Sequence, residues 1–332
     1  MKKFLAVFMA RNKEFFLDKG TLAWIILFPI LLIFGFSIAF SGKNQSLYKV
    51  GIIGEINQTK DFYNIKYIQF INYESKEKAL TKLRHHQIDF LIELQKNNYW
   101  VNINSPNSYI VEKLFLSSET SKNYVKETIT GKAIRYVDWV MPGILGMNIM
   151  FNSLFGVGFV IVRYRRNGVL KRLKATPLSA FEFITAQVVS RLLIVVGIST
   201  FVFLGCNFFL KFLILGSLLD ILIIALIGSF CHITLGLLFA CRLKSEELAN
   251  GLINIVSWPM MLLSGVWFSL EGSPKILQTI SNFFPLTHFI TAIRKIMLDG
   301  ATLIDVSSHI IILSLLSLFF LILSSLLFSW DN

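Results

Sequence analysis

Three histidines and an arginine lie inside or beside long apolar runs of this chain. They are His232, His288, His309 and Arg191. An ionisable side chain is costly in such a run and often marks a functional site. Catalysis or metal binding would also need a partner acid or a second ligand at a suitable spacing. The motifs HExxH, GxSxG and GxGxxG are absent, so we assign no catalytic, cofactor-binding or metal-binding residue. For Arg191 we expect contact with lipid headgroups or a pairing within the protein, with contact to a substrate as the alternative.

A second concentration of charge could hold a partner. Residues 160–179 read VIVRYRRNGVLKRLKATPLS and contain no acidic residue. The basic residues are Arg163, Arg165, Arg166, Lys171, Arg172 and Lys174. Two long apolar runs flank this segment, so the positive-inside rule places it in the cytoplasm. These charges beside a membrane account for much of the net charge of +12, and we predict no nucleic-acid partner.

The interior of this segment predicts a short helix. Gly168 permits a turn, and three apolar residues, Val169, Leu170 and Leu173, separate the charges. Thr176 and Pro177 stop one helix before the next begins. We predict a helix over 165–174 within a cytoplasmic loop spanning 163–181. A helix with a basic face and three apolar side chains suits docking in a groove of another protein; the alternative is that the segment only orients the membrane spans.

The amino-acid composition predicts which kind of secondary structure positions these residues. The chain has 332 residues, of which 54% are hydrophobic and 16% charged, whereas soluble domains carry about 25% charged residues. The apolar residues form runs long enough to cross a bilayer. We therefore predict an α-helical integral membrane protein with six transmembrane helices. These spans are expected over 20–41, 140–162, 183–210, 218–241, 252–270 and 306–330.

The residues before the first span predict a different helix. Phe4, Phe8 and Phe15 fall at helical spacing, with Arg11 and other charged residues between them. This pattern suits an amphipathic helix over 1–19 on the cytoplasmic membrane face, with an ordinary cytoplasmic tail as the alternative.

Residues 42–138 have the composition of a folded α/β domain. Charges of both signs are interspersed, and short apolar runs at 50–53 and 90–94 predict strands. Helices are expected over 76–86 and 109–127. An inserted domain between the first two spans would lie outside the cytoplasm, across the membrane from the basic segment. Spans two to six then fill 139–332.

Segment 271–300 is too interrupted to span a membrane. Pro274 can begin a short helix, Pro285 begins another, and Gly300 ends it. Two short helices that satisfy their own backbone could enter the outer leaflet as a re-entrant segment. Six spans return the C-terminus to the cytoplasm.

Several of these segments together resemble the membrane subunit of ABC-2-type exporters. The segments that show the resemblance are RNGVLKRLKATPLS in the basic segment, MPGILGMNIMF at 141–151 and the stretch 262–300. That last stretch has a small-residue turn, a proline-led helix, then Pro-Leu-Thr and a basic residue before a glycine. The large insert after the first span is similar to the branch of the family with an extracytoplasmic domain there.

The resemblance implies a permease that hydrolyses no ATP itself. Two such subunits pair, as a homodimer or heterodimer, and each docks on a separate ATPase subunit that binds ATP and Mg. The implied coupling residues are Arg165, Arg166, Gly168, Leu170, Lys171, Arg172, Thr176 and Pro177. Structural or gating residues of the outer segment are Gly265, Pro274, Pro285, Thr287 and Arg294.

The resemblance also implies a location and a direction of transport. A drug-like, lipid-like or glycoconjugate substrate would leave through a bacterial inner membrane, with both termini cytoplasmic. Membrane lipids are expected partners, and a periplasmic adaptor is a further candidate. Two other interpretations stay open from the residues: a membrane-anchored receptor that binds a ligand through 42–138, and an intramembrane enzyme acting on lipids.

Overall fold

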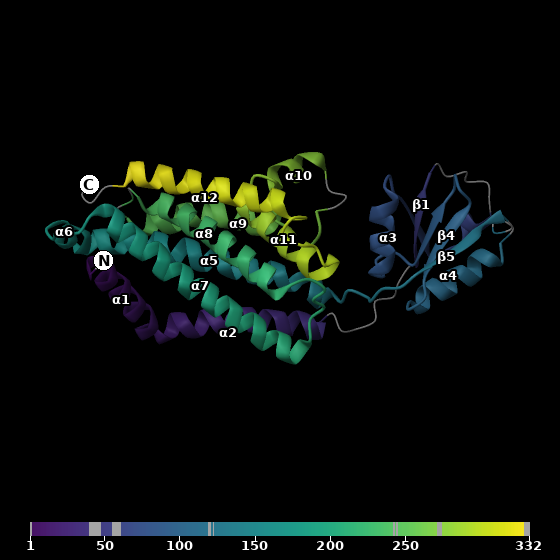
Figure 1. The fold of residues 1–332 in the computed structure, drawn as a ribbon, viewed down its shortest axis with the longest axis horizontal. Helices are drawn as coiled ribbons and strands as arrows, with labels where there is room; N and C mark the ends of the chain where they lie inside the picture. Colours follow the sequence, from purple (N-terminus) through teal and green to yellow (C-terminus); the bar gives the residue numbers. More distant parts are fainter. Residues whose placement is uncertain are drawn as a thin grey trace. The chain divides into compact units, whose positions relative to one another are not determined.

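The computed structural model describes residues 2–39, 48–54, 61–118, 121, 123–241, 243, 245–270 and 274–328. Within them the chain forms two compact units, each treated separately below (Figure 1). A helical unit combines Met1–Ala39 with Val137–Asn332, and a sheet unit occupies Phe40–Tyr136. The predicted end of the sixth span, at 330, lies outside the described residues.

The helical unit consists of long helices joined by short connections. Its helices are α1 (Lys2–Leu17), α2 (Lys19–Ala39), α5 (Tyr136–Arg166), α6 (Val169–Lys174), α7 (Ala180–Leu210), α8 (Leu218–Ala240), α9 (Glu246–Leu263), α10 (Lys275–Ser281), α11 (Pro285–Asp299) and α12 (Ser307–Leu327). In the described part of the chain, five of them are long and apolar enough to cross a membrane: α2, α5, α7, α8 and α12.

The helix at the expected fifth span has other bounds. We expected 252–270, but α9 runs from Glu246 to Leu263. It starts earlier because the Ser245 hydroxyl accepts a hydrogen bond from the Leu248 N–H and caps it. It ends earlier because Gly265 takes a φ of 71°, which a continuing helix does not allow.

The boundary between the units also differs from the expected residue 138. Helix α5 begins at Tyr136, so Asp138 lies within its first turn and is buried. The Asp138 carboxylate accepts a hydrogen bond of 3.1 Å from the Leu213 N–H, in the connection between α7 and α8. That contact holds the start of α5 in the helical unit.

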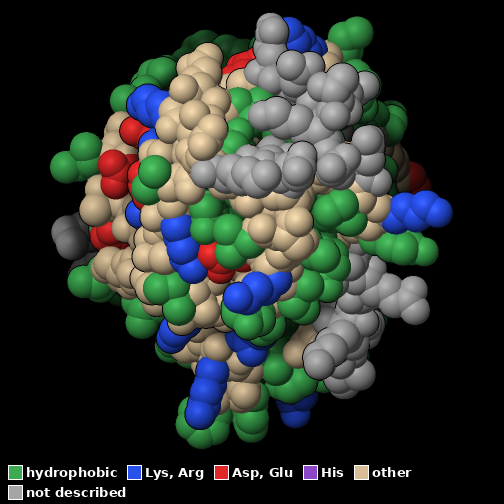
Figure 2. All heavy atoms as spheres, turned by 90° about the vertical axis from the view of Figure 1, so that its right-hand side faces the viewer, with side chains coloured by type: hydrophobic (Ala, Val, Ile, Leu, Met, Phe, Trp, Pro, Cys, Tyr) green, Lys and Arg blue, Asp and Glu red, His purple; other side chains and the backbone are tan. Residues whose placement is uncertain are grey.

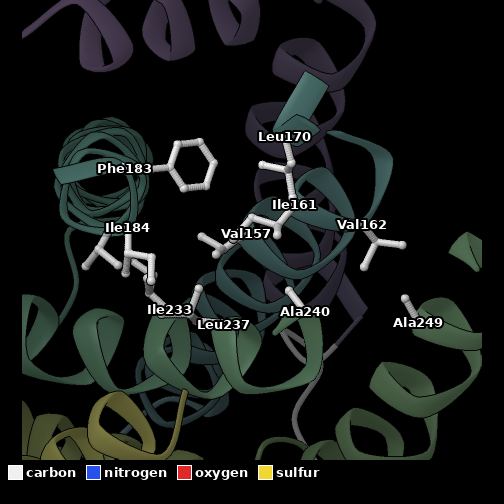
Figure 3. Packing of buried hydrophobic residues seen from close by; sticks show 11 residues of the cluster. Val157, Ile161, Val162, Leu170, Phe183, Ile184, Ile233, Leu237, Ala240 and Ala249 are labelled. Carbon is white, nitrogen blue, oxygen red and sulfur yellow. The ribbon is translucent and has the colours of Figure 1, made fainter. Parts of the chain in front are cut away.

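Close helix packing forms the core of this unit. A Cβ atom at Gly236 of α8 would lie 3.0 Å from the Leu154 Cα of α5, so glycine lets these helices approach. A buried cluster joins α5, α6, α7, α8 and α9 (Figure 3). Helix α6 and the C-terminal end of α12 lie at one end of the unit, and α10 and α11 lie at the other (Figure 1).

The sheet unit contains one mixed five-stranded sheet in the order β2-β1-β3-β4-β5. The strands are β1 (Tyr48–Ile53), β2 (Ile68–Asn72), β3 (Phe90–Glu93), β4 (Asn98–Asn102) and β5 (Val125–Ile129). Only β3 and β4 pair antiparallel, while the other neighbours are parallel. The described part of the unit also contains a 3-10 helix, η1 (Asp61–Asn64), and two α-helices, α3 (Lys76–Arg84) and α4 (Pro106–Leu116).

Alternating strand residues build a core on each face of the sheet. Phe90 of β3 packs with Phe62 and with Phe115 of α4, whereas the next residue, Leu91, packs on the other face with Leu83 of α3. Side chains of both charges are interspersed with hydrophobic ones in the space-filling view (Figure 2).

The helix predicted over 109–127 is wrong in its second half. Helix α4 ends at Leu116, where the Ser117 and Ser118 hydroxyls donate to the carbonyls of Leu114 and Phe115. These bonds compete with helix continuation. Val125 then begins β5, which pairs with β4.

Candidate functional site

The predicted helix over 165–174 is shorter than expected. Arg165 and Arg166 form the last turn of α5, and α6 starts only at Val169. Gly168 between them has a φ of 70°, and a helix does not continue through a left-handed residue. Of the predicted loop 163–181, the first four residues belong to α5 and the last two to α7.

Leu170 anchors α6 to the helical unit. Its side chain is fully buried and points toward Ile161 of α5, while Phe183 of α7 projects into the same space (Figure 3). We expected Leu170 on a surface facing a partner, whereas it faces the interior of its own chain. Because its side chain meets both α5 and α7, α6 is attached to two membrane helices.

Arg165 attaches the same region to α8. Its Nη1 donates to the carbonyls of Ala240 at 2.9 Å and Leu243 at 2.5 Å, and its Nη2 donates to that of Cys241 at 2.9 Å. These are carbonyls that a helix end leaves unsatisfied. The neighbouring Arg166 forms an ion pair of 3.4 Å with Glu246 at the start of α9. The two arginines therefore fix the connection between α8 and α9.

The remaining predicted residues face outward. Lys171, Arg172, Thr176 and Pro177 are exposed, as are Arg163 and Lys174. We call Arg163, Lys171, Arg172 and Lys174 the basic surface. It ends where Ser179 and Glu182 form a capping box that starts α7.

Helix α1 is bonded to this region. The Lys3 ammonium donates to the Pro177 carbonyl at 2.5 Å, and the Tyr164 hydroxyl donates to the Glu14 carboxylate. Arg11 is 5% exposed and donates to the Gly156 carbonyl of α5 at 3.0 Å. Helix α1 therefore packs on the neighbouring helices through these polar contacts as well as through Phe15, which is buried beside Ile25 and Ile194. The phenylalanine pattern did not indicate the polar contacts.

Arg191 lies buried in α7 beside the same turn of α5. Its Nε donates to the Asn152 carbonyl at 2.9 Å, and its Nη2 donates to the same oxygen. Its guanidinium carbon also lies 5.3 Å from the ring centroid of Phe15 in α1. The guanidinium occupies the space that a Cβ atom would take at Gly156. Arg191 therefore joins α1, α5 and α7.

The predicted residues of segment 271–300 mark where its helices begin. Helix α10 follows Pro274 directly, α11 starts at Pro285, and Gly300 ends α11 with a φ of 69°. Thr287 donates to the Ser264 hydroxyl at 3.0 Å and lies 3.1 Å from the Ser281 hydroxyl. This hydroxyl chain joins the ends of α9 and α10 to the start of α11.

Replacing Thr287 with valine should remove this chain while keeping the shape of the side chain. We expect a loss of about 1–3 kcal/mol of stability, because buried hydroxyl partners would stay unsatisfied. Thermal unfolding of the detergent-solubilised protein measures it, and Thr287→Ser is the control that keeps the hydroxyl. Equal melting temperatures for the two variants would contradict a role for the chain.

Arg294 joins α11 to the start of α5. Its Nε donates to the Trp139 carbonyl at 3.0 Å, and its guanidinium carbon lies 3.7 Å from the centroid of the Trp139 ring. Its Nη2 also reaches the Val266 carbonyl at 3.5 Å, next to Gly265. The two predicted residues Gly265 and Arg294, distant in sequence, therefore meet.

A pair of histidines was not foreseen from the sequence. His288 of α11 and His309 of α12 have their Nδ1 atoms 3.0 Å apart. The His288 Nε2 lies 2.8 Å from the Asn282 carbonyl. The position of His288 among buried residues of an amphipathic helix was the available signal, but only the fold supplies its partner. No group of three or more possible metal ligands occurs among the residues described.

Comparisons with known proteins agree with this architecture. A model of the ABC-2 family transporter protein matches residues 19–326. The chain is 26% identical over 155 residues to the inner membrane transport permease YhhJ of Escherichia coli K12, covering 46% of this chain and 41% of that protein. It is 23% identical over 198 residues to the probable multidrug ABC transporter permease YbhR of the same organism, covering 55% and 54%.

A third relative comes from another organism. The linearmycin resistance permease protein LnrN of Bacillus subtilis is 24% identical over 169 residues, which cover 48% of this chain and 42% of LnrN. The chain thus spans about half the length of these relatives or less. The family model, in contrast, covers most of the chain and includes the helices that carry the basic surface, Arg191 and Arg294. This multi-pass membrane protein therefore belongs to the ABC-2 family of transporter proteins.

Proposed function

We propose that this chain is the permease subunit of an ABC exporter whose basic surface docks on a separate ATPase subunit. The observation that carries the proposal is the construction around α6: basic side chains point outward while Leu170 is fully buried. A partner that pushed on α6 would act on α5 and α7 together, because Leu170 contacts both. ATP and Mg are bound by the partner.

Helix α1 would take part in the same movement. The bond from Lys3 to the Pro177 carbonyl links its N-terminal end to the connection between α6 and α7. Arg11 and Glu14 link its middle to α5. Displacement of α6 would thus reach α1 without passing through the apolar core.

The proposed topology has six spans with both termini in the cytoplasm. Helix α9 is the additional span, since its 18 residues extend about 27 Å at 1.5 Å per residue, close to the hydrocarbon thickness. The basic surface then lies in the cytoplasm under the positive-inside rule. The sheet unit and the pair α10–α11 lie on the outer side of a bacterial inner membrane.

The substrate we propose is amphipathic: drug-like, lipid-like or a glycoconjugate. It moves outward between two permease subunits, which form a homodimer or a heterodimer. The names of the relatives YbhR and LnrN, which mention multidrug transport and linearmycin resistance, support this class. A periplasmic adaptor could bind the sheet unit.

Charge reversal on the basic surface tests the docking. We expect the double variant Lys171→Glu, Arg172→Glu to lose co-purification with an ATP-hydrolysing protein from host membranes by about tenfold or more. Like charges at an interface cost several kcal/mol, and each 1.4 kcal/mol is tenfold in affinity. The measurement is ATPase activity recovered with the tagged chain.

The matched control is Lys275→Glu, which reverses an exposed charge at the opposite end of the helical unit. It should leave co-purification unchanged. If both variants retained the ATPase equally, docking through the basic surface would be excluded. ATP hydrolysis by the purified chain alone would argue against a separate ATPase.

A further inference from the structure

A cavity of about 220 Å³ lies among four helices of the helical unit. Met141 and Leu145 of α5 form one wall, and Phe203 of α7 and Ala225 of α8 form others. Ile293 of α11 closes one side. The cavity therefore lies at the α11 end of the helical unit, away from the basic surface.

The lining excludes a charged occupant. Among the described residues that line the cavity, Ser199 and Thr200 are the polar ones and none is ionisable. A charged or strongly polar group that moved from water into this cavity would find few hydrogen-bond partners in the lining, and its transfer would cost several kcal/mol. An apolar occupant has no such desolvation cost, and it makes dispersion contacts with the lining residues that are missing when the cavity is empty.

The rim identifies the source of that occupant. Leu204 of α7 and Leu219 of α8 line the cavity and are 50% and 70% exposed. Both belong to helices that are long and apolar enough to cross a membrane. In the proposed membrane topology these exposed apolar side chains would face hydrocarbon, so the cavity would open sideways toward lipid tails.

We propose that this cavity binds one acyl chain of a membrane lipid. The chain enters between the C-terminal half of α7 and the N-terminal half of α8. It then contacts Ile293 and Phe289 of α11, so that a bound lipid supports the packing of α11. The proposal requires only that these helices lie in a membrane; it does not depend on an ATPase partner or on the transported substrate.

Photocrosslinking in nanodiscs tests the proposal. The probe is a phosphatidylcholine with a diazirine near the end of one acyl chain, and labelled residues are mapped by mass spectrometry. We expect labels on Leu145 and Ile149, which line the cavity but are only 8% and 2% exposed. Labelling confined to freely exposed side chains such as Phe208, which is 77% exposed, would overturn it.

A variant in which a larger side chain fills the cavity provides a second test. Ala225→Phe places a ring in the cavity and should reduce labelling of Leu145 and Ile149 about tenfold, the effect of losing 1.4 kcal/mol of binding. Leu226→Phe is the matched control, because the adjacent Leu226 does not line the cavity and is 36% exposed; it should label like the parent. Equal labelling in both would overturn the proposal.

Should Ala225→Phe fail to fold, Thr200→Phe fills the same cavity from α7. Correct folding is checked by an unchanged elution volume and melting curve. Labelling of Leu145 that excess unlabelled lipid does not reduce would point to non-specific reaction and would also count against a site.

Discussion

Replacing Leu170 with aspartate is expected to detach α6 from the helical unit and abolish transport. The leucine side chain is fully buried between α5 and α7. Truncation of such a leucine to alanine costs about 2–5 kcal/mol, and aspartate adds the cost of burying a charge without a partner. Leu173 of α6 is only partly buried against the same cluster, so its packing does not compensate for the loss of the fully buried Leu170.

Two measurements separate the effects of this variant. The melting temperature in detergent reports the loss of packing. Under the proposed function, ATP-driven efflux in vesicles that also contain the ATPase would report the loss of coupling. Leu170→Met is the control, since a volume-conserving change costs less than about 1.5 kcal/mol and should keep transport. Normal transport by a folded Leu170→Asp variant would show that α6 transmits no movement through this contact.

Replacing Gly156 with alanine is expected to be strongly destabilising. The new Cβ would occupy the place of the Arg191 guanidinium, which is bonded to the Asn152 carbonyl. Arg191 is only 4% exposed, so it has little room to move. Breaking the contacts of a buried charge costs about 3–5 kcal/mol. Thermal unfolding of the purified protein measures the loss.

Two further variants test the stated cause. Gly197→Ala in α7 adds the same methyl group where nothing lies within 4 Å, so it should be neutral or slightly stabilising, by up to about 1 kcal/mol. Combining Gly156→Ala with Arg191→Met should recover most of the lost stability, because the guanidinium is then absent. Additive losses in that double variant would place the strain elsewhere.

The long helices were predictable because one physical requirement determines them. An apolar run of about twenty residues with at most one charge must be helical where no water satisfies its backbone, and α2, α7, α8 and α12 follow such runs. Prolines and glycines predicted where the shorter helices begin and end, as at Pro274, Pro285 and Gly300. The ends of helices depend on contacts as well, and the expected bounds of α9 and α4 were therefore wrong.

The partners of the site residues were not predictable from spacing. Leu170 looks like a surface residue in a basic segment, yet the packing of α5 against α7 buries it. The pair His288 and His309 comes from different helices, and the position of the Arg191 side chain depends on a glycine 35 residues earlier. Each of these contacts exists only once helices distant in sequence have met.

The order in which this chain is made therefore matters for its assembly. Asn12 of α1 accepts a hydrogen bond from the Ser190 hydroxyl of α7, a residue 178 positions later. At synthesis rates of about 5–20 residues per second, α1 waits about 10–40 s for its partner. During that time the sheet unit, which lies between them in sequence, can complete its own fold. Arg11 already pairs with Glu14 of the same helix, but the side-chain amide of Asn12 must meanwhile be satisfied by water or headgroups. Helix α1 is thus made first but cannot reach its final position until α7 has been made, and a delay in the sheet unit would prolong its exposure.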